Sequence, residues 1–183
     1  ESFLLGDEVV VSASLFEQNI LTAPVSIEKL DIIDIEQGSA ANFYDELYKI
    51  KGVDMIVQSL SMRFPNTRGF NGNTNYRINQ LVDGVNNSAP GLSFSPGNIF
   101  GLVQLDVESV ELVVGASSAL YGPGGMNGTL LMTSKNPFDY EGLSLSIQGG
   151  IMHLQNDYNK DPSFMNDFSF RYGFLREELE FIS

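Results

Sequence analysis

The stretch from Gly115 to Ala119 places a serine where a hydrolase could carry its nucleophile. It departs from the G-x-S-x-G elbow of serine hydrolases in its last residue, which the elbow needs as glycine. The sole histidine, His153, lies in a segment of alternating apolar and polar residues and does not follow an acidic triad member. We therefore expect no catalytic residues, and a pocket that gathered Ser117 or Ser118, His153 and a carboxylate would overturn this expectation.

The glycines at positions 122, 124, 125 and 128 could cradle a phosphate or bend the chain. Asn127 stands at the third glycine position of G-x-G-x-x-G, and no Gly-Lys-Ser/Thr follows. Phosphate binding is therefore disfavoured. Small residues here favour a sharp turn and the close approach of two backbones instead.

Residues 157–161 partly match a calcium-binding loop. Asp157, Asn159 and Asp161 occupy its first, third and fifth places, but Pro162 and Phe168 stand where glycine and a bidentate glutamate are required. We interpret this segment as a hairpin loop and expect no metal and no cofactor.

The composition of the chain excludes several classes of function. Ten Lys and Arg residues against 23 Asp and Glu give a formal net charge of -13, which is the wrong sign for holding nucleic acid through its phosphates. There is no cysteine, so disulfides and thiolate chemistry are ruled out. No apolar run approaches the roughly 20 residues of a spanning helix, whereas strands of a membrane barrel need only about 9–11 alternating residues.

The elements that must position these residues are short strands separated by turns. β-Branched and apolar runs predict strands at 7–14, 24–30, 53–57, 77–84, 110–114 and 129–133, with long loops over 66–75 and 86–98. One helix is expected between Ser39 as its N-cap and Gly52 near its C-terminal end. Its apolar residues at helical spacing are Ala40, Phe43, Tyr44, Leu47 and Ile50.

The composition changes after about Tyr140, where apolar and polar residues alternate with period two. The apolar members are Leu143, Leu145, Ile147 and Ile151 in one run, and Phe168, Phe170, Tyr172 and Phe174 in the next. A third strand is expected over residues 179–183. The alternation predicts a set of antiparallel strands, either from a membrane barrel or from a soluble sheet with one buried face.

Six segments occur in the order DEVVVSAS, PVSIEKLD, KIKGVDM, TRGFNG, LVDGV and VESVELVVGASSALYGPGGMNGTLLMTSKNP. This order covers about Asp7 to Pro137 and resembles the plug domain of TonB-dependent outer-membrane receptors. The resemblance implies an α+β fold with a small mixed four-stranded sheet, short helices and long loops, lodged in a barrel of about 22 strands. It divides the chain into an N-terminal segment, 1–14, a plug, 15–140, and the first strands of a truncated barrel, 141–183.

The resemblance also implies a function and a location. Such receptors import bulky nutrients such as iron chelates, vitamins or oligosaccharides, and they are driven by TonB, which pulls on a short box before the plug. The expected partners are therefore TonB, a transported small ligand, the chain's own β-barrel and, through it, the outer membrane. The N-terminus would be periplasmic. The rival hypothesis is a soluble periplasmic or extracellular ligand-binding module without a transport role.

Candidate site residues follow from the same resemblance. Asp7, Glu8, Val9, Val10, Val11, Ser12 and Ala13 resemble the TonB box, because an extended β-branched segment can add as a strand to a partner's sheet, although an ordinary first strand of the plug needs the same residues. Arg68 and Glu111 are candidate contacts between plug and barrel, and Arg68 could equally be a surface residue beside a turn. The family usually has Arg-Gly-Pro where this chain has Val114-Gly115-Ala116, which puts part of that contact in doubt.

Two further groups complete the expected site. Gly69, Asp83, Gly84, Gly115, Tyr121 and Gly122 are expected to be structural, with Asp83-Gly84 forming a turn and Tyr121 packing while its hydroxyl meets a polar neighbour. The candidates for facing the ligand are Asn71, Asn73, Asn75, Tyr76 and Phe94, which equally suit plain turns.

Overall fold

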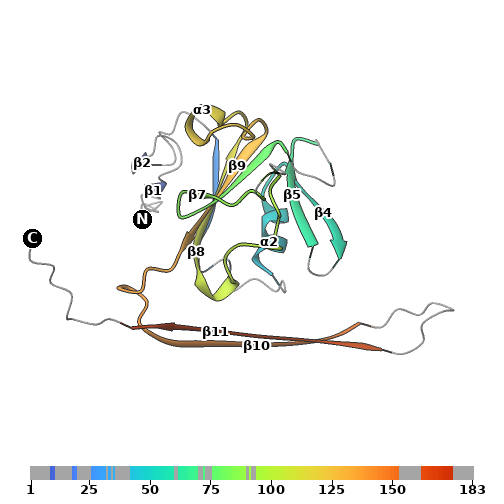
Figure 1. Cartoon of the computed structure of the whole chain (residues 1–183), viewed down its shortest axis with the longest axis vertical. Helices are drawn as coiled ribbons and strands as arrows, with labels where there is room; N and C mark the ends of the chain where they lie inside the picture. Colours follow the sequence, from blue (N-terminus) through green and yellow to red (C-terminus); the bar gives the residue numbers. More distant parts are fainter. Residues whose placement is uncertain are drawn as a thin grey trace, which may run out of the picture. The chain divides into compact units, whose positions relative to one another are not determined.

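The computed structural model describes residues 9–10, 18–19, 26–31, 33, 35, 42–59, 62–69, 72, 76–89, 91, 94–152 and 162–174 (Figure 1). The chain divides into two compact units, Glu1–Ser134 and Lys135–Ser183. Within the residues described, no helix is both long enough and apolar enough to cross a membrane.

The first unit is built on a five-stranded sheet with the order β3-β8-β9-β6-β7. Its strands are β3 (Ile27–Asp31), β6 (Ile78–Val82), β7 (Val85–Asn86), β8 (Val107–Val114) and β9 (Gly128–Ser134). β6 pairs with β9 in parallel, and the other neighbours are antiparallel. The mixed sheet confirms the α+β class. It has one strand more than predicted, because the chain turns back after β6 and adds the two-residue β7.

Two further pairs of strands in this unit lie outside this sheet. β4 (Val53–Ser59) and β5 (Met62–Thr67) form a hairpin of their own. The predicted strand at 53–57 is therefore confirmed, whereas the assignment of Asn66 and Thr67 to a loop is wrong. Pro65 and Asn66 are unfavourable in central strands, but a two-stranded ribbon leaves one edge of each strand unpaired, where proline is tolerated. β1 (Val9–Val10) pairs with β2 (Gln18–Asn19) in another two-stranded sheet.

The predicted helix is shorter than expected. α2 (Phe43–Glu46) runs into a 3-10 turn, η2 (Leu47–Lys49), and two further short elements are η3 (Gln104–Asp106) and α3 (Ser118–Tyr121). The N-cap of α2 is Asn42, which has extended backbone angles and whose Oδ1 accepts a hydrogen bond from the Tyr44 N–H at 2.9 Å. The assignment of the cap to Ser39 is wrong for α2, because Asn caps as well as Ser and stands directly before the first helical turn.

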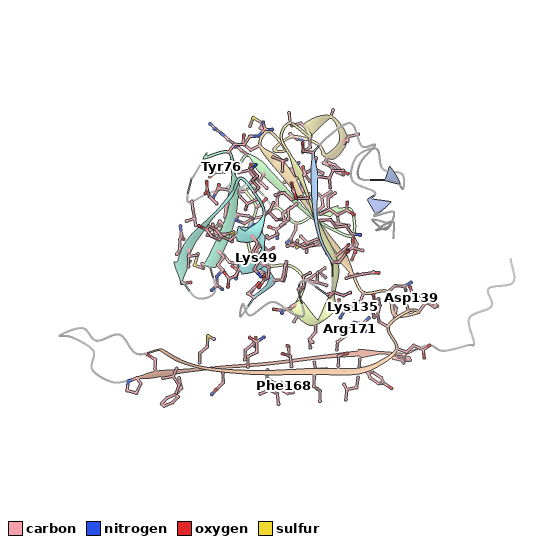
Figure 2. All side chains as sticks on the ribbon, turned by 180° about the vertical axis from the view of Figure 1, so that it is seen from behind. Lys49, Tyr76, Lys135, Asp139, Phe168 and Arg171 are labelled. Atoms are coloured by element: carbon pink, nitrogen blue, oxygen red, sulfur yellow. The ribbon has the colours of Figure 1, made fainter. Side chains whose placement is uncertain are left out.

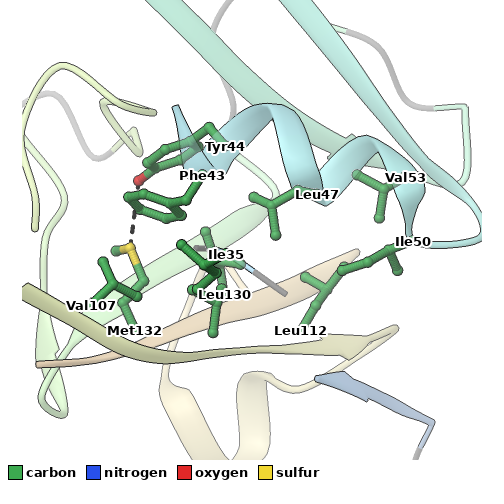
Figure 3. Close-up of a cluster of buried hydrophobic side chains, with 11 residues drawn as sticks. Ile35, Phe43, Tyr44, Leu47, Ile50, Val53, Val107, Leu112, Leu130 and Met132 are labelled. Carbon is green, nitrogen blue, oxygen red and sulfur yellow. Dashed lines mark hydrogen bonds between the residues drawn. The ribbon is translucent and has the colours of Figure 1, made fainter. Parts of the chain in front are cut away.

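The core lies between the sheet and α2 (Figure 3). The sheet presents Val110, Leu112, Leu130 and Met132, which are at most 1 % exposed, to the helix residues Phe43, Tyr44 and Leu47. Side chains of this size contribute about 1.5–3 kcal/mol each when they are fully buried. The helix thus holds one face of the sheet through apolar burial.

A small hydrogen-bond network of Tyr44, Gln80 and the Gly97 carbonyl lies within this core. The Tyr44 hydroxyl donates a hydrogen bond to the Gly97 carbonyl at 2.8 Å, and the Gln80 side-chain amide donates to the same carbonyl at 2.9 Å and to the Tyr44 oxygen. Burial raises the pKa of Tyr44 although the Gln80 hydrogen bond opposes the shift. The network ties the Gly97 carbonyl to Gln80 of β6 and to Tyr44 of α2.

The second unit contains a long hairpin of β10 (Gly142–Met152) and β11 (Ser163–Gly173). Eleven residue pairs run in unbroken register from Gly142 opposite Gly173 to Met152 opposite Ser163. The predicted antiparallel strands with period two are confirmed, and residues 179–183 lie outside the described residues.

The two faces of this hairpin differ sharply. Eight apolar side chains share one face, on which Gly149 and Asn166 also lie, and are 57–79 % exposed: Leu143, Leu145, Ile147, Ile151, Phe164, Phe168, Phe170 and Tyr172. The other face carries serine and charged residues such as Ser144, Ser146, Asp167, Ser169 and Arg171.

Candidate functional site

The glycine-rich stretch between β8 and β9 forms a compact turn tied to both strands. The Gly115 N–H donates to the Asn127 carbonyl at 2.9 Å, and the Ser117 N–H donates to the Gly125 carbonyl at 2.8 Å. The Asn127 N–H donates to the Arg77 carbonyl at 2.9 Å, and the Thr67 hydroxyl donates to the Asn127 carbonyl at 2.9 Å. Asn127 therefore fastens the turn to the start of β6 and to the end of β5.

Ser117 lies inside this turn. It is 3 % exposed, and its Oγ lies 2.5 Å from Thr129 Oγ1 and 3.4 Å from the Gly125 carbonyl oxygen. A Cβ added at Gly125 would lie 2.8 Å from Ser117 Oγ, so glycine is needed for this close approach. The Ser117 hydroxyl is thus held by contacts within the turn, which indicates a structural role. His153 lies outside the described residues.

Asn79 of β6 holds the far side of the turn. Its Nδ2 donates to the carbonyls of Tyr121 at 3.0 Å and Gly122 at 3.2 Å. Gly122, just after α3, has φ 82° and ψ -179°, a region that is open essentially to glycine alone. The sequence gives no local indication of this role for Asn79, because its partners are 42 and 43 residues away.

Arg68 and Gly115, far apart in sequence, meet at this end of the sheet. Arg68 and Gly69 form a turn with φ 59° and 71° after β5. A Cβ on Gly115 would lie 2.9 Å from Arg68 Nη2, so the guanidinium lies directly over this glycine. Arg68 is exposed, and no ion pair of its side chain occurs among the residues that the structure describes.

Glu111 and Tyr121 interact on the face of the sheet opposite α2. Glu111 is 9 % exposed and stands opposite Lys29 in the pairing of β8 with β3. Burial and the charge of Glu111 raise the pKa of the Tyr121 hydroxyl. The Tyr121 side chain is therefore half-buried within the electrostatic reach of a carboxylate.

Asp83 and Gly84 form the two-residue turn between β6 and β7, with φ 48° and 80°. The Asp83 carboxylate accepts hydrogen bonds from the N–H and the hydroxyl of Ser134, both at 2.8 Å. This turn thus anchors the last residue of β9.

The other candidate residues are only partly described. Tyr76 is 52 % exposed, and its ring meets that of Phe94 edge to face at a centroid distance of 6.2 Å. Asn71, Asn73 and Asn75 lie outside the described residues. So do Asp7, Glu8, Val11, Ser12 and Ala13 of the TonB-box candidate, of which only the backbone of Val9 and Val10, in β1, is described. Among the side chains that are described, no cluster of His, Asp and Glu has the form of a metal site.

A small mixed sheet with short helices, glycine-rich turns and long loops is the arrangement expected of the plug. The model of the TonB-dependent receptor plug domain matches residues 19–129. The chain belongs to this family.

Relatives and solved structures agree with this assignment. The vitamin B12 transporter BtuB of Vibrio vulnificus is 29 % identical over 174 residues, covering 92 % of this chain and 26 % of that protein. The siderophore receptor PirA of Pseudomonas aeruginosa superposes with a TM-score of 0.55 at 23 % identity, covering 85 % of this chain and 25 % of PirA. A variant of the ferric enterobactin receptor PfeA from the same organism gives a TM-score of 0.58 at 20 % identity, covering 89 % of this chain and 23 % of PfeA.

The chain spans about a quarter of the length of the curated relatives that it matches. These relatives are named as a transporter and a utilization protein, and the solved structures as receptors. The comparisons thus support a receptor plug and give no support to a soluble module without a transport role.

Proposed function

We propose that this chain is the gating domain, with the first barrel strands, of an active transporter of the outer membrane. The transporter imports a bulky nutrient such as an iron chelate, a vitamin or an oligosaccharide, and the plug closes the barrel lumen until TonB acts on it. Membership of the plug family supports this proposal. The nutrients in the names of the relatives, vitamin B12 and siderophores, belong to the same broad class of bulky ligand.

The observation that carries the proposal is the hairpin of β10 and β11. Each strand has 11 residues. At about 3.3 Å per residue and a tilt of about 40°, such a strand spans roughly 28 Å, close to the apolar band of about 25 Å in outer-membrane barrels. One hairpin face is mainly apolar and exposed, and the other is mainly polar, which is the pattern of the lipid and lumen faces of a barrel.

Energy would enter at the N-terminal segment. In this proposal residues Asp7 to Ala13 add as a strand to TonB on the periplasmic side, since β-branched residues suit that mode of binding. The pull then moves or partly unfolds the plug. The small sheet and its long loops suit local unfolding.

Arg68 serves as a contact with the polar wall of the barrel in this proposal, whereas Glu111, the other candidate, is 9 % exposed and suits that contact less well. The exposed guanidinium of Arg68 over Gly115 takes over the role that the family usually gives to the arginine replaced by Val114. The exposed ring of Tyr76, with Phe94 and the neighbouring asparagines 71, 73 and 75, faces the ligand. No catalytic role is proposed, because Ser117 is buried in hydrogen bonds that hold the turn.

Arginine substitutions on the two hairpin faces test the membrane assignment in the full-length receptor. Ile147→Arg and Phe168→Arg place a charge on the apolar face and should cost about 2–4 kcal/mol near the bilayer midplane. Ser146→Arg and Ser169→Arg, one residue away on the polar face, are the matched controls. The measurement is the fraction of receptor folded in the outer membrane, and equal effects on both faces would refute the proposal.

Binding of the purified TonB C-terminal domain tests the partner. We expect the full-length receptor to bind it and a receptor without residues 7–13 to lose that binding. Unchanged binding after the deletion would show that residues 7–13 are not the TonB box.

A further inference from the structure

Residues 135–141, which join β9 to β10, are folded into a tight turn within the second unit. The Asn136 carbonyl accepts hydrogen bonds from the N–H groups of Asp139 at 3.1 Å and Tyr140 at 3.0 Å. The Asn136 side chain accepts from the Phe138 N–H at 3.1 Å and donates to the Asp139 carboxylate at 2.8 Å. Lys135 Nζ lies 5.5 Å from the centroid of the Tyr140 ring.

Arg171 of β11 holds both ends of this turn. Its Nη1 donates to the Tyr140 carbonyl at 2.8 Å, and its Nη2 donates to the Lys135 carbonyl at 3.0 Å. Arg171 lies on the face of the hairpin opposite Phe168, beside Lys135 (Figure 2). The planar guanidinium suits two carbonyls at once, and the ammonium group of lysine lacks that fork.

Gly173 provides the room for this attachment. It is buried, and a Cβ added to it would lie 2.6 Å from the Tyr140 carbonyl oxygen and 3.3 Å from Arg171 Nη1. The joining segment therefore passes directly over this glycine. Two residues of β11, the guanidinium of Arg171 and the glycine at position 173, thus hold the same segment in place.

We propose that Arg171 and Gly173 fasten residues 135–141 to the barrel wall, so that the movable plug ends at Ser134. The inference rests on the proposed function, which takes β10 and β11 as barrel strands and the plug as the part that moves under force. Force applied to the plug then unravels the chain up to Ser134 and stops at the Arg171 fork. Residues 135–141 thus stay attached to β11 when the plug moves. A free linker would instead extend together with the plug.

Pulling on an N-terminal handle of the full-length receptor in a lipid bilayer tests this directly, with or without TonB. In the wild type the chain should extend only to Ser134. Arg171→Met removes both donors at similar side-chain volume, and Gly173→Ala displaces the Tyr140 carbonyl without removing a donor. Either change should release residues 135–141 and lengthen the final extension by about 25 Å, at roughly 3.6 Å per residue.

Ser169→Ala, on the same face of β11 and two residues before Arg171, is the control and should leave the extension unchanged. The proposal is overturned if the wild type already extends through residue 141, or if Arg171→Met extends no further than the wild type. Loss of TonB binding would count against the proposed function alone, because the handle replaces TonB.

Amide exchange in the wild type gives a second measurement that needs no variant. In urea that melts β8 and β9, the amides of Asp139 and Tyr140 should keep the protection of the β10–β11 hairpin. Their exchange together with the plug amides would overturn the proposal.

Discussion

The buried pair Ser117 and Thr129 allows a sharp test of the turn that closes the sheet. Thr129 is 0 % exposed, and its hydroxyl lies 2.5 Å from the Ser117 hydroxyl. Ser117→Ala leaves the Thr129 hydroxyl buried without that partner, which costs about 1–3 kcal/mol. Thr129→Val should cost about 1 kcal/mol, because Ser117 keeps the Gly125 carbonyl at 3.4 Å.

The double variant removes both hydroxyls and leaves two apolar groups of nearly the same shape. This replacement leaves no buried hydroxyl without a partner. The loss of unfolding free energy in the double variant should therefore be about 1 kcal/mol smaller than the sum of the losses in the two single variants. The assay is urea unfolding of the plug in the full-length receptor, followed through amide exchange in β6, β8 and β9. With a slope of about 2 kcal/mol per molar urea, a loss of 2 kcal/mol moves the midpoint by about 1 M.

Additive effects within about 0.3 kcal/mol would refute this account of the pair. So would a Ser117→Ala variant with unchanged stability. Unchanged stability is what a reactive hydroxyl in an open site would give, because its removal leaves no buried group without a hydrogen-bond partner.

Three further predictions concern single positions. Gly125→Ala should destabilise the plug by about 1–3 kcal/mol in the same unfolding assay, because its Cβ would lie 2.8 Å from a buried hydroxyl oxygen, whereas Gly149→Ala, with its nearest atom at 3.9 Å, should be silent. Asp83→Ala should cost about 3 kcal/mol, since it loses two hydrogen bonds to the end of β9 and puts alanine at φ 48°, whereas Asp83→Asn should cost about 1 kcal/mol. Burial raises the pKa of Asp45 although Arg63 opposes the shift, so the folded state binds this proton more tightly than the unfolded state does. Its contribution to stability should therefore rise as the pH falls through the raised pKa toward 3.8. A pH series of unfolding midpoints should show this rise in the wild type and not in Asp45→Asn. The same pH profile in both proteins would contradict the assignment.

Local patterns carried most of the strand prediction. The alternation in residues 143–151 and 168–174 predicted the hairpin because side chains on a strand point to its two faces in turn. The type of each element was harder to infer where two signals competed. Pro65 and Asn66 favour a loop on propensity alone, and only the pairing of Met55 with Pro65 makes the segment a strand.

Contacts between distant residues could not be predicted in this way. Nothing local to Arg68 or Gly115 indicates that the guanidinium lies over the glycine, since the neighbouring Thr67 hydroxyl and the Gly115 N–H meet at the carbonyl of the distant Asn127. The clamp by Arg171 depends equally on the fold of residues 135–141. Its one local indication is an arginine two residues before a glycine, near the end of a predicted strand.

Conductance of the barrel tests the central claim, that residues up to Ser134 close a pore, most directly. The full-length receptor and a variant without residues 1–134 are each placed in a planar lipid bilayer under potassium chloride. The account predicts a closed full-length receptor and large, steady open channels for the variant. Equal conductance of the two proteins, open or closed, would contradict it.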